Sequence, residues 1–130
     1  MTKAEPAGLE VREILLTEAQ IAEKVAGLAR AIAPRIDDDT VAVCLLTGGL
    51  WFAADLTRAL AREGRHVRFD ALWLASYGDE RASLGRCEVR ADLQRPLAGR
   101  RALVIDDVFD TGLPYRRPTA WSATPAPPRC

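Results

Sequence analysis

The chain has 130 residues, enough for one domain with a single hydrophobic core. Eighteen acidic residues balance eighteen basic ones, so no overall charge favours nucleic acid or an anionic membrane as a partner. The sequence has no apolar run of membrane-spanning length and no signal-type segment. Cys44, Cys87 and Cys130 show no metal-ligand spacing, and we expect reduced thiols and a cytoplasmic location.

The amino-terminal part predicts a short strand followed by a helix. Residues Val11–Leu16 could form the strand. Thr17 and Gln20 have the spacing of a capping box, which starts a helix. Apolar residues then recur at helical spacing until Pro34 ends the helix: Ile21, Val25, Leu28 and Ile32.

The middle of the chain predicts a strand, a helix and a second strand. Val41–Leu46 is a continuous apolar run, as expected for a strand buried on both faces. A helix is expected from Leu50 to Glu63, where Gly64 stops it, and Val67–Ala75 is expected as the next strand. This order implies a parallel pair of strands with a right-handed crossover.

The next segment predicts a loop, then two further strands. Residues 77–86 are polar and contain glycine, so we expect a mobile loop there. Cys87–Ala91 is a candidate strand, and Pro96 and Gly99 mark a turn before the strand Ala102–Ile105. The pattern predicts an α/β domain with a mainly parallel sheet, and Trp73 is expected in its core.

Three loops follow strands of this sheet, where open α/β sheets bind ligands. They are Leu46-Thr47-Gly48-Gly49, the segment that begins Ser76-Tyr77-Gly78, and Asp106–Gly112. Adjacent acids at the end of a buried strand are costly unless a cation, hydroxyl groups or amides satisfy them. A turn of small residues can present N–H groups to a phosphate. Taken singly, these loops are also compatible with an ordinary polar turn, a glycine turn that starts a helix, and a surface loop.

Together, and in this order, the three loops resemble the hypoxanthine–guanine branch of the type I phosphoribosyltransferases. The resemblance covers about residues 12–112 and includes Ile14–Glu18 and Phe52–Leu56. It implies a three-layer, Rossmann-like α/β domain that transfers phosphoribose from phosphoribosyl pyrophosphate to a purine base. It also implies Mg²⁺ as cofactor and the homo-oligomeric state usual in the family, with no nucleic acid or membrane partner.

The resemblance also implies roles for individual residues. Leu46, Thr47 and Gly48 would bind pyrophosphate, with a cis peptide bond between Leu46 and Thr47. Ser76 and Tyr77 would begin a catalytic loop that closes over the reacting centre.

In the third loop, the resemblance assigns Asp106 and Asp107 to the ribose hydroxyls and the magnesium environment. Asp110 would exchange a proton with the purine ring nitrogen. The Thr111 hydroxyl and the amides of residues 110–112, ending at Gly112, would hold the 5′-phosphate.

The resemblance ends after Gly112. Residues 113–130 contain five of the eight prolines in the sequence, and nothing in them matches the family's later base-binding residues or closing strands. We expect residues 1–112 to form the amino-terminal portion of a phosphoribosyltransferase-like domain and residues 113–130 to be an irregular Pro/Arg-rich tail. An out-of-frame or foreign end and a genuine short variant are both compatible with this tail. A second functional hypothesis is a non-catalytic, nucleotide-binding or regulatory relative.

Overall fold

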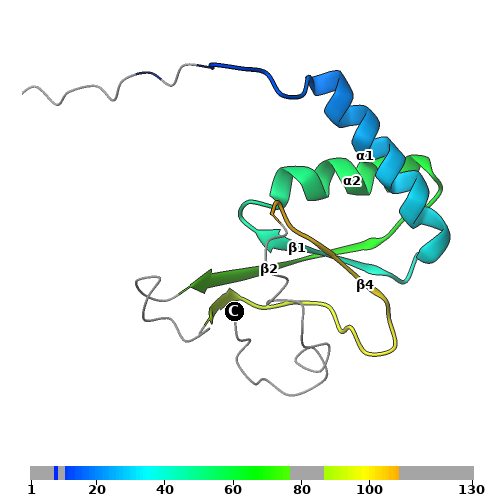
Figure 1. Ribbon diagram of the computed structural model, residues 1–130. Helices are drawn as coiled ribbons and strands as arrows, with labels where there is room; N and C mark the ends of the chain where they lie inside the picture. The colour runs from blue at the N-terminus through cyan, green and yellow to red at the C-terminus, as the bar shows by residue number, and fades with distance from the viewer. Residues whose placement is uncertain (1–7, 9–10, 77–86, 109–130) are drawn as a thin grey trace, which may run out of the picture.

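The computed structural model describes residues 8, 11–76 and 87–108, and these residues form a four-stranded sheet with two helices on one face (Figure 1). No helix among them is long and apolar enough to cross a membrane. In chain order the elements are α1 (Glu18–Ile32), a short 3₁₀ turn (Ala33–Arg35), β1 (Val41–Leu46), α2 (Leu50–Arg62), β2 (Arg68–Ser76), β3 (Cys87–Ala91) and β4 (Ala102–Ile105).

Most of the elements agree with the sequence prediction to within one or two residues. The capping box is confirmed: the Thr17 N–H donates to Gln20 Oε1 at 2.8 Å, and the Gln20 N–H donates to the Thr17 hydroxyl at 3.2 Å. Gly64 follows α2 with a φ of +78°, a conformation that glycine adopts without strain. The predicted loop 77–86 and the tail 113–130 lie outside the described residues.

Two predictions from the sequence are wrong. Val11–Leu16 is not a strand, and its apolar side chains are exposed, Val11 by 82% and Leu15 by 81%. A strand needs a neighbouring strand to pair with, and no described strand pairs with this segment. Trp73 is not in the core, because its side chain is 37% exposed and the Arg90 guanidinium lies 5.5 Å from its ring centre.

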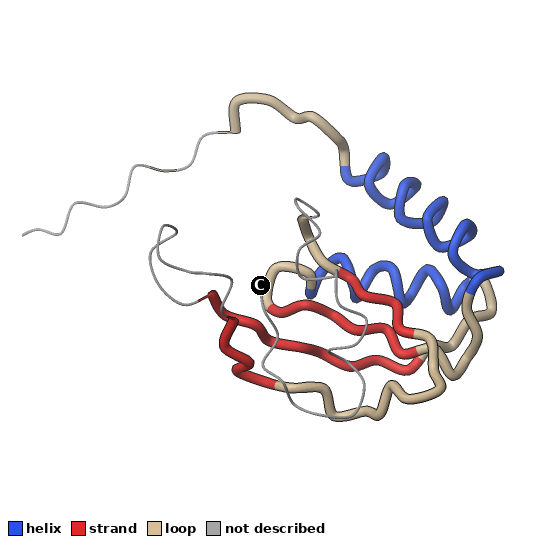
Figure 2. Tube along the Cα trace, turned by 60° about the horizontal axis from the view of Figure 1, so that its bottom comes forward, coloured by secondary structure: helices blue, strands red, loops and turns tan. Residues whose placement is uncertain are grey.

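The sheet is mainly parallel, as predicted. Its strand order is β3-β2-β1-β4, with β1 parallel to both β2 and β4, and β3 antiparallel to β2. Cys44 of β1 pairs with Ala71 of β2 and with Ile105 of β4. The carboxyl ends of the three parallel strands therefore meet at one edge of the sheet (Figure 2).

Alternating residues of β1 divide the core into two parts. On the helix side, Ala42 and Cys44 pack with buried residues of both helices and of β4, among them Ala29, Ala53, Leu56, Leu60 and Ile105. On the other side, Val41 and Val43 pack with Leu72, and the connection between β3 and β4 adds Leu93 and Leu97. Because both described helices lie on one face, the third layer of the predicted domain is not among the described residues.

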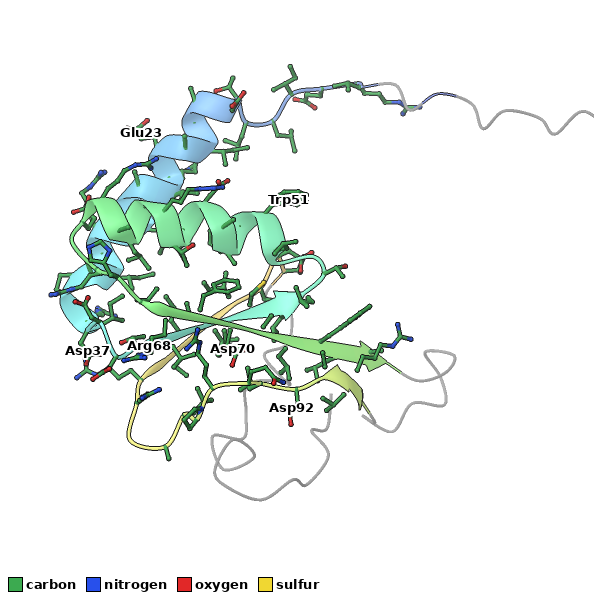
Figure 3. The ribbon with its side chains drawn as sticks, turned by 180° about the vertical axis from the view of Figure 1, so that it is seen from behind. Glu23, Asp37, Trp51, Arg68, Asp70 and Asp92 are labelled. Carbon is green, nitrogen blue, oxygen red and sulfur yellow. The ribbon has the colours of Figure 1, made fainter. Side chains whose placement is uncertain are left out.

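Asp70 attaches the connection between β3 and β4 to the face opposite the helices (Figure 3). Its side chain is buried, and its Oδ2 accepts hydrogen bonds from the Gln94 N–H at 2.8 Å and the Arg95 N–H at 2.7 Å. The Arg95 side chain returns a bond to the Phe69 carbonyl at 2.9 Å. Asp70 is thus a structural carboxylate, whose charge is satisfied by backbone amides.

Replacing Asp70 with Ala leaves these two amides without their acceptor. We expect Asp70→Ala to lower the free energy of unfolding by about 1.5–3 kcal/mol, the range for hydrogen bonds to a charged group. Urea unfolding measures this loss. Asp92→Ala is the matched control, since the exposed Asp92 side chain accepts a local bond from the neighbouring Leu93 N–H, at 2.7 Å. Equal losses in the two variants would contradict the role given to Asp70.

Candidate functional site

The loop between β1 and α2 makes a tight turn at the carboxyl edge of the sheet. The Gly49 N–H donates to the Leu45 carbonyl at 3.1 Å, and the Leu50 N–H donates to the Thr47 carbonyl at 3.2 Å. The peptide bond between Leu46 and Thr47 is cis, as the family resemblance implied. Helix α2 begins directly after the turn, so the positive end of its dipole lies at this edge.

The two glycines of this loop lie against the end of β4. A Cβ atom on Gly48 would lie 2.7 Å from Asp107 Cγ. A Cβ on Gly49 would lie 2.9 Å from the Leu45 carbonyl oxygen, 3.0 Å from the Ile105 carbonyl oxygen and 3.2 Å from Asp106 Cα. Neither glycine has a positive φ, so the constraint here is space, and it is strict at Gly49, where the neighbouring atoms belong to the backbone.

The two aspartates that follow β4 differ in their exposure. Asp106 is half-buried, and its Oδ1 accepts a hydrogen bond from the Asp107 N–H at 2.8 Å. Asp107 is exposed and points its carboxylate at Gly48. Burial, together with the negative charge of Asp106, raises the pKa of the Cys44 thiol beneath them. At neutral pH this thiol is protonated, which suits a core residue better than a nucleophile.

The structure brings together five of the site residues predicted from the sequence. Leu46, Thr47 and Gly48 lie at the same edge as Asp106 and Asp107. Ser76 ends β2, which extends three residues beyond Trp73, the partner of Leu46. The remaining predicted residues lie outside the described part of the chain: Tyr77, Asp110, Thr111 and Gly112.

Sequence reasoning left Gly49 out of the site. This residue is buried and lies against the backbone at the end of β4, whereas Gly48 lies against a side chain. The signal in the sequence was the pair of consecutive glycines, and only the tertiary structure shows that each one meets a different part of the Asp106–Asp107 segment.

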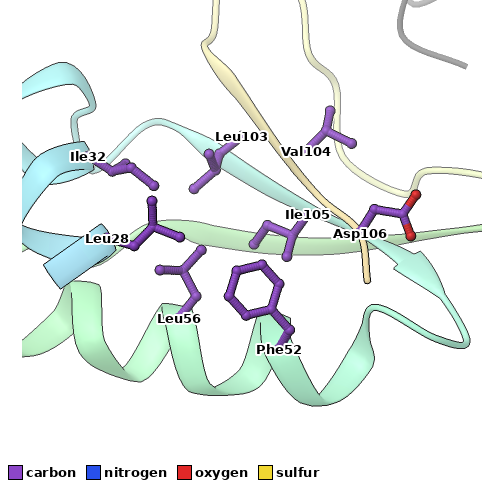
Figure 4. A pocket seen from close by; sticks show the side chains of 8 residues that line it. All are labelled: Leu28, Ile32, Phe52, Leu56, Leu103, Val104, Ile105 and Asp106. Atoms are coloured by element: carbon purple, nitrogen blue, oxygen red, sulfur yellow. The ribbon is translucent and has the colours of Figure 1, made fainter. Parts of the chain in front are cut away.

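An apolar groove of about 280 Å³ lies beside this polar edge, between α1, α2 and β4 (Figure 4). Its lining is aliphatic and aromatic apart from Asp106 at one end, and it comprises Leu28, Ile32, Phe52, Leu56, Leu103, Val104, Ile105 and Asp106. Such a lining has few groups able to orient a polar substrate. The polar side chains of this region lie at the strand ends, and the groove is a separate, apolar feature.

The contacts of the two glycines generate a paired prediction. In Gly49→Ala the added methyl group meets backbone atoms, and we expect about 1–3 kcal/mol lower stability, as in overpacked cores. In Gly48→Ala it meets the exposed Asp107 side chain, which can turn away, so stability should change much less. Thermal and urea unfolding of both variants measure the difference.

Gly27→Ala is the control for this pair. Gly27 lies in α1, and its added Cβ would be 3.7 Å from an Arg30 side-chain nitrogen, an ordinary contact distance. We expect a gain of about 0.5–1 kcal/mol there, because alanine favours helix more than glycine does. A Gly49→Ala protein as stable as the unsubstituted chain would contradict the close packing of loop and strand.

Comparison with known proteins identifies similar sequences and structures. No protein-family model matches the chain. The chain is 34% identical over 104 residues to the hypoxanthine-guanine phosphoribosyltransferase of Dictyostelium discoideum, covering 78% of this chain and 58% of that protein. It is 32% identical over 123 residues to the enzyme of the same name from Mycobacterium avium, covering 87% of this chain and 59% of that protein.

Solved structures agree with these sequence matches. A hypoxanthine-guanine phosphoribosyltransferase of Bacillus anthracis superposes with a TM-score of 0.71 at 30% identity, over 81% of this chain and 61% of that one. The hypoxanthine phosphoribosyltransferase of Trypanosoma cruzi also gives a TM-score of 0.71, at 28% identity, over 78% and 58% of the two chains. The chain thus spans a little over half the length of these relatives. Sequence and fold together show that it is a hypoxanthine–guanine phosphoribosyltransferase-like chain over the part that it shares with them.

Proposed function

We propose that this chain carries the phosphoribosyl pyrophosphate site of a purine phosphoribosyltransferase. The complete protein would transfer 5-phosphoribose to a hypoxanthine- or guanine-type base and release pyrophosphate. One observation supports this proposal most. The Thr47–Gly49 turn, which leads into α2, lies directly against Asp106 and Asp107. This arrangement joins backbone amides and a helix N-terminus, which suit phosphate, to carboxylates that suit sugar hydroxyls and a cation.

Mg²⁺ fits the side chains at this edge. Among the described residues no group of three or more metal-binding side chains gathers, but Asp106 and Asp107 offer adjacent carboxylates. Magnesium commonly binds through one or two carboxylates together with substrate phosphates. When bound with the substrate, it would neutralise the charge of the departing pyrophosphate.

Different residues of the chain would then bind the two phosphate groups, exchange the proton and exclude water. Leu46, Thr47 and Gly48 would hold the pyrophosphate, while Thr111 and Gly112 would hold the 5′-phosphate. A ring nitrogen of the purine forms the new bond to C1′ of the ribose as the bond from C1′ to pyrophosphate breaks. Asp110 would exchange a proton with the purine ring, and the loop that begins Ser76-Tyr77 would exclude water from the activated sugar.

A transferase is favoured over a non-catalytic, nucleotide-binding relative. The relatives at 30–35% identity carry transferase names, and the described part of the chain brings the Thr47–Gly49 turn against Asp106 and Asp107. The substrates we propose are phosphoribosyl pyrophosphate and a purine base, without nucleic acid or membrane as a partner. A cytoplasmic location would suit an enzyme of nucleotide salvage and agrees with the free, buried Cys44.

The ligand prediction concerns the charge of the aspartate pair. Asp106→Asn/Asp107→Asn removes two charges but keeps an oxygen that can accept the Asp107 N–H bond. We expect the affinity for phosphoribosyl pyrophosphate with Mg²⁺ to fall at least tenfold, since each charged hydrogen bond is worth roughly 1.5–3 kcal/mol. Isothermal titration calorimetry measures the change.

The double variant Asp39→Asn/Asp92→Asn controls for net charge. Both of these aspartates are exposed, and they lie before β1 and after β3. This control should bind phosphoribosyl pyrophosphate as the unsubstituted chain does. Equal affinity in the Asp106/Asp107 variant, or an equal loss in the control, would contradict the proposed site.

A further prediction concerns turnover by the 130-residue chain. We expect little or no nucleotide formation, because residues 113–130 do not match the family's base-binding segment. Positioning of two substrates contributes up to ~7–11 kcal/mol in well-oriented systems. A radiolabelled purine assay tests this expectation, and turnover near 1 per second, ordinary for an enzyme, would contradict it. If the chain is active, Asp110→Asn should lower turnover roughly 10²–10⁴-fold, as for a lost acid–base group.

A further inference from the structure

The carboxylate of Asp107 lies where a side chain on Gly48 would lie. A Cβ atom on Gly48 would be 2.7 Å from Asp107 Cγ and 3.0 Å from its Oδ1, with Oδ2 nearer still. These distances are shorter than the roughly 3.5–4.0 Å of an ordinary non-bonded contact. Both carboxylate oxygens therefore lie against the turn that leads into α2.

The turn contains hydrogen-bond donors that the described part of the chain does not use. The Gly49 and Leu50 N–H groups are bonded inside the turn, at 3.1 and 3.2 Å. No carbonyl group of a described residue accepts from the N–H groups of Thr47 or Gly48. Amides without an intrahelical partner at the start of a helix attract anions. The position that Asp107 occupies is thus one that also suits a phosphate group.

The two aspartates differ in how firmly they are held. Asp106 is half-buried, and its Oδ1 accepts the Asp107 N–H at 2.8 Å. The Asp107 side chain is exposed, and among the described residues no group donates a hydrogen bond to its carboxylate. No bond to a described group therefore prevents Asp107 from rotating to another side-chain rotamer, away from Gly48.

The Asp107 carboxylate and a pyrophosphate group cannot share this position. Both are negatively charged, and two like charges in contact repel unless a cation lies between them. A divalent cation reverses the sign of the interaction, because Mg²⁺ binds carboxylate and phosphate oxygens together. The same side chain therefore opposes metal-free pyrophosphate and favours pyrophosphate that carries a metal ion.

We propose that Asp107 makes the Thr47–Gly49 turn selective for metal-bound pyrophosphate over metal-free pyrophosphate. In the free chain the Asp107 carboxylate occupies the turn, and a metal-free pyrophosphate group has to displace it. A pyrophosphate group that carries Mg²⁺ instead meets a ligand for the metal. This role rests on the proposed function, in which the turn receives the pyrophosphate group of the substrate.

Asp107→Asn tests this role, because it removes the charge and keeps the size of the side chain. The probe is inorganic pyrophosphate, titrated into the 130-residue chain with excess EDTA and, separately, with excess Mg²⁺. The amide NMR signals of Gly48 and Gly49 report both the affinity and the location of binding. We expect Asp107→Asn to bind metal-free pyrophosphate roughly three- to tenfold more tightly than the unsubstituted chain, and the magnesium complex roughly three- to tenfold more weakly.

Two further variants separate this contact from the general charge of the protein. Asp92→Asn removes one exposed charge after β3 and should change neither affinity. Asp106→Asn removes a carboxylate that is not among the nearest neighbours of Gly48, and the new amide oxygen can still accept the Asp107 N–H. Its gain in affinity for metal-free pyrophosphate should be smaller than that of Asp107→Asn. Equal gains would show that net charge, and not the contact with Gly48, opposes the anion, and would overturn the proposal.

The outcomes distinguish a failure of this role from a failure of the proposed function. If pyrophosphate moves the Gly48 and Gly49 signals but Asp107→Asn leaves both affinities unchanged, the turn binds pyrophosphate and Asp107 does not select its metal-bound form. If pyrophosphate moves neither signal in any of the proteins, with or without Mg²⁺, the proposed function and the role of Asp107 both fail.

A second readout follows the Asp107 side chain itself. In the unsubstituted chain, metal-free pyrophosphate should shift the carbon-13 signal of the Asp107 carboxylate, because the carboxylate leaves the turn as the anion binds. A carboxylate signal that stays unchanged while the Gly48 amide signal moves would contradict the displacement.

Discussion

The close approach of the β1–α2 turn to the end of β4 is the constraint on which the candidate site depends. At Gly49 there is no room for a Cβ between the carbonyl groups of Leu45 and Ile105, and Gly48 lies directly against the Asp107 side chain. Because both glycines lack side chains, the start of α2 and the two aspartates share one edge of the sheet. Elements about sixty residues apart in the sequence thus form one polar surface.

The rest of the fold holds this edge in place. β1 is an inner strand of the sheet, with Ala42 and Cys44 packed under the helices and Val41 and Val43 packed on the opposite face. Parallel pairing on both sides of β1 aligns the carboxyl ends of β2 and β4 with its own. Asp70 fastens the chain that leads into β4, so a buried carboxylate remote from the site helps to fix the strand that carries Asp106.

Local patterns predicted the elements because each pattern reflects a local cause. Apolar runs predicted β1 and β4, and the Thr17–Gln20 box predicted the start of α1. These local patterns could not predict strand pairing or hydrogen bonds between residues that are far apart in the sequence. Val11–Leu16 has strand-like composition, but none of the described strands pairs with it. The amides that satisfy Asp70 come from residues 24 and 25 positions later. The family resemblance found Asp106 and Asp107, whereas the role of Gly49 depends on a tertiary contact.

The most direct test of the account is an amide-resolved NMR titration of the chain with phosphoribosyl pyrophosphate and Mg²⁺. The amides of Thr47, Gly48 and Gly49 and those of Asp106 and Asp107 should show the largest chemical-shift changes, because both segments line one edge. Changes confined to one of the two segments would contradict a shared site. Changes centred on the opposite end of β1, at Asp37–Thr40, would contradict the location of the site altogether.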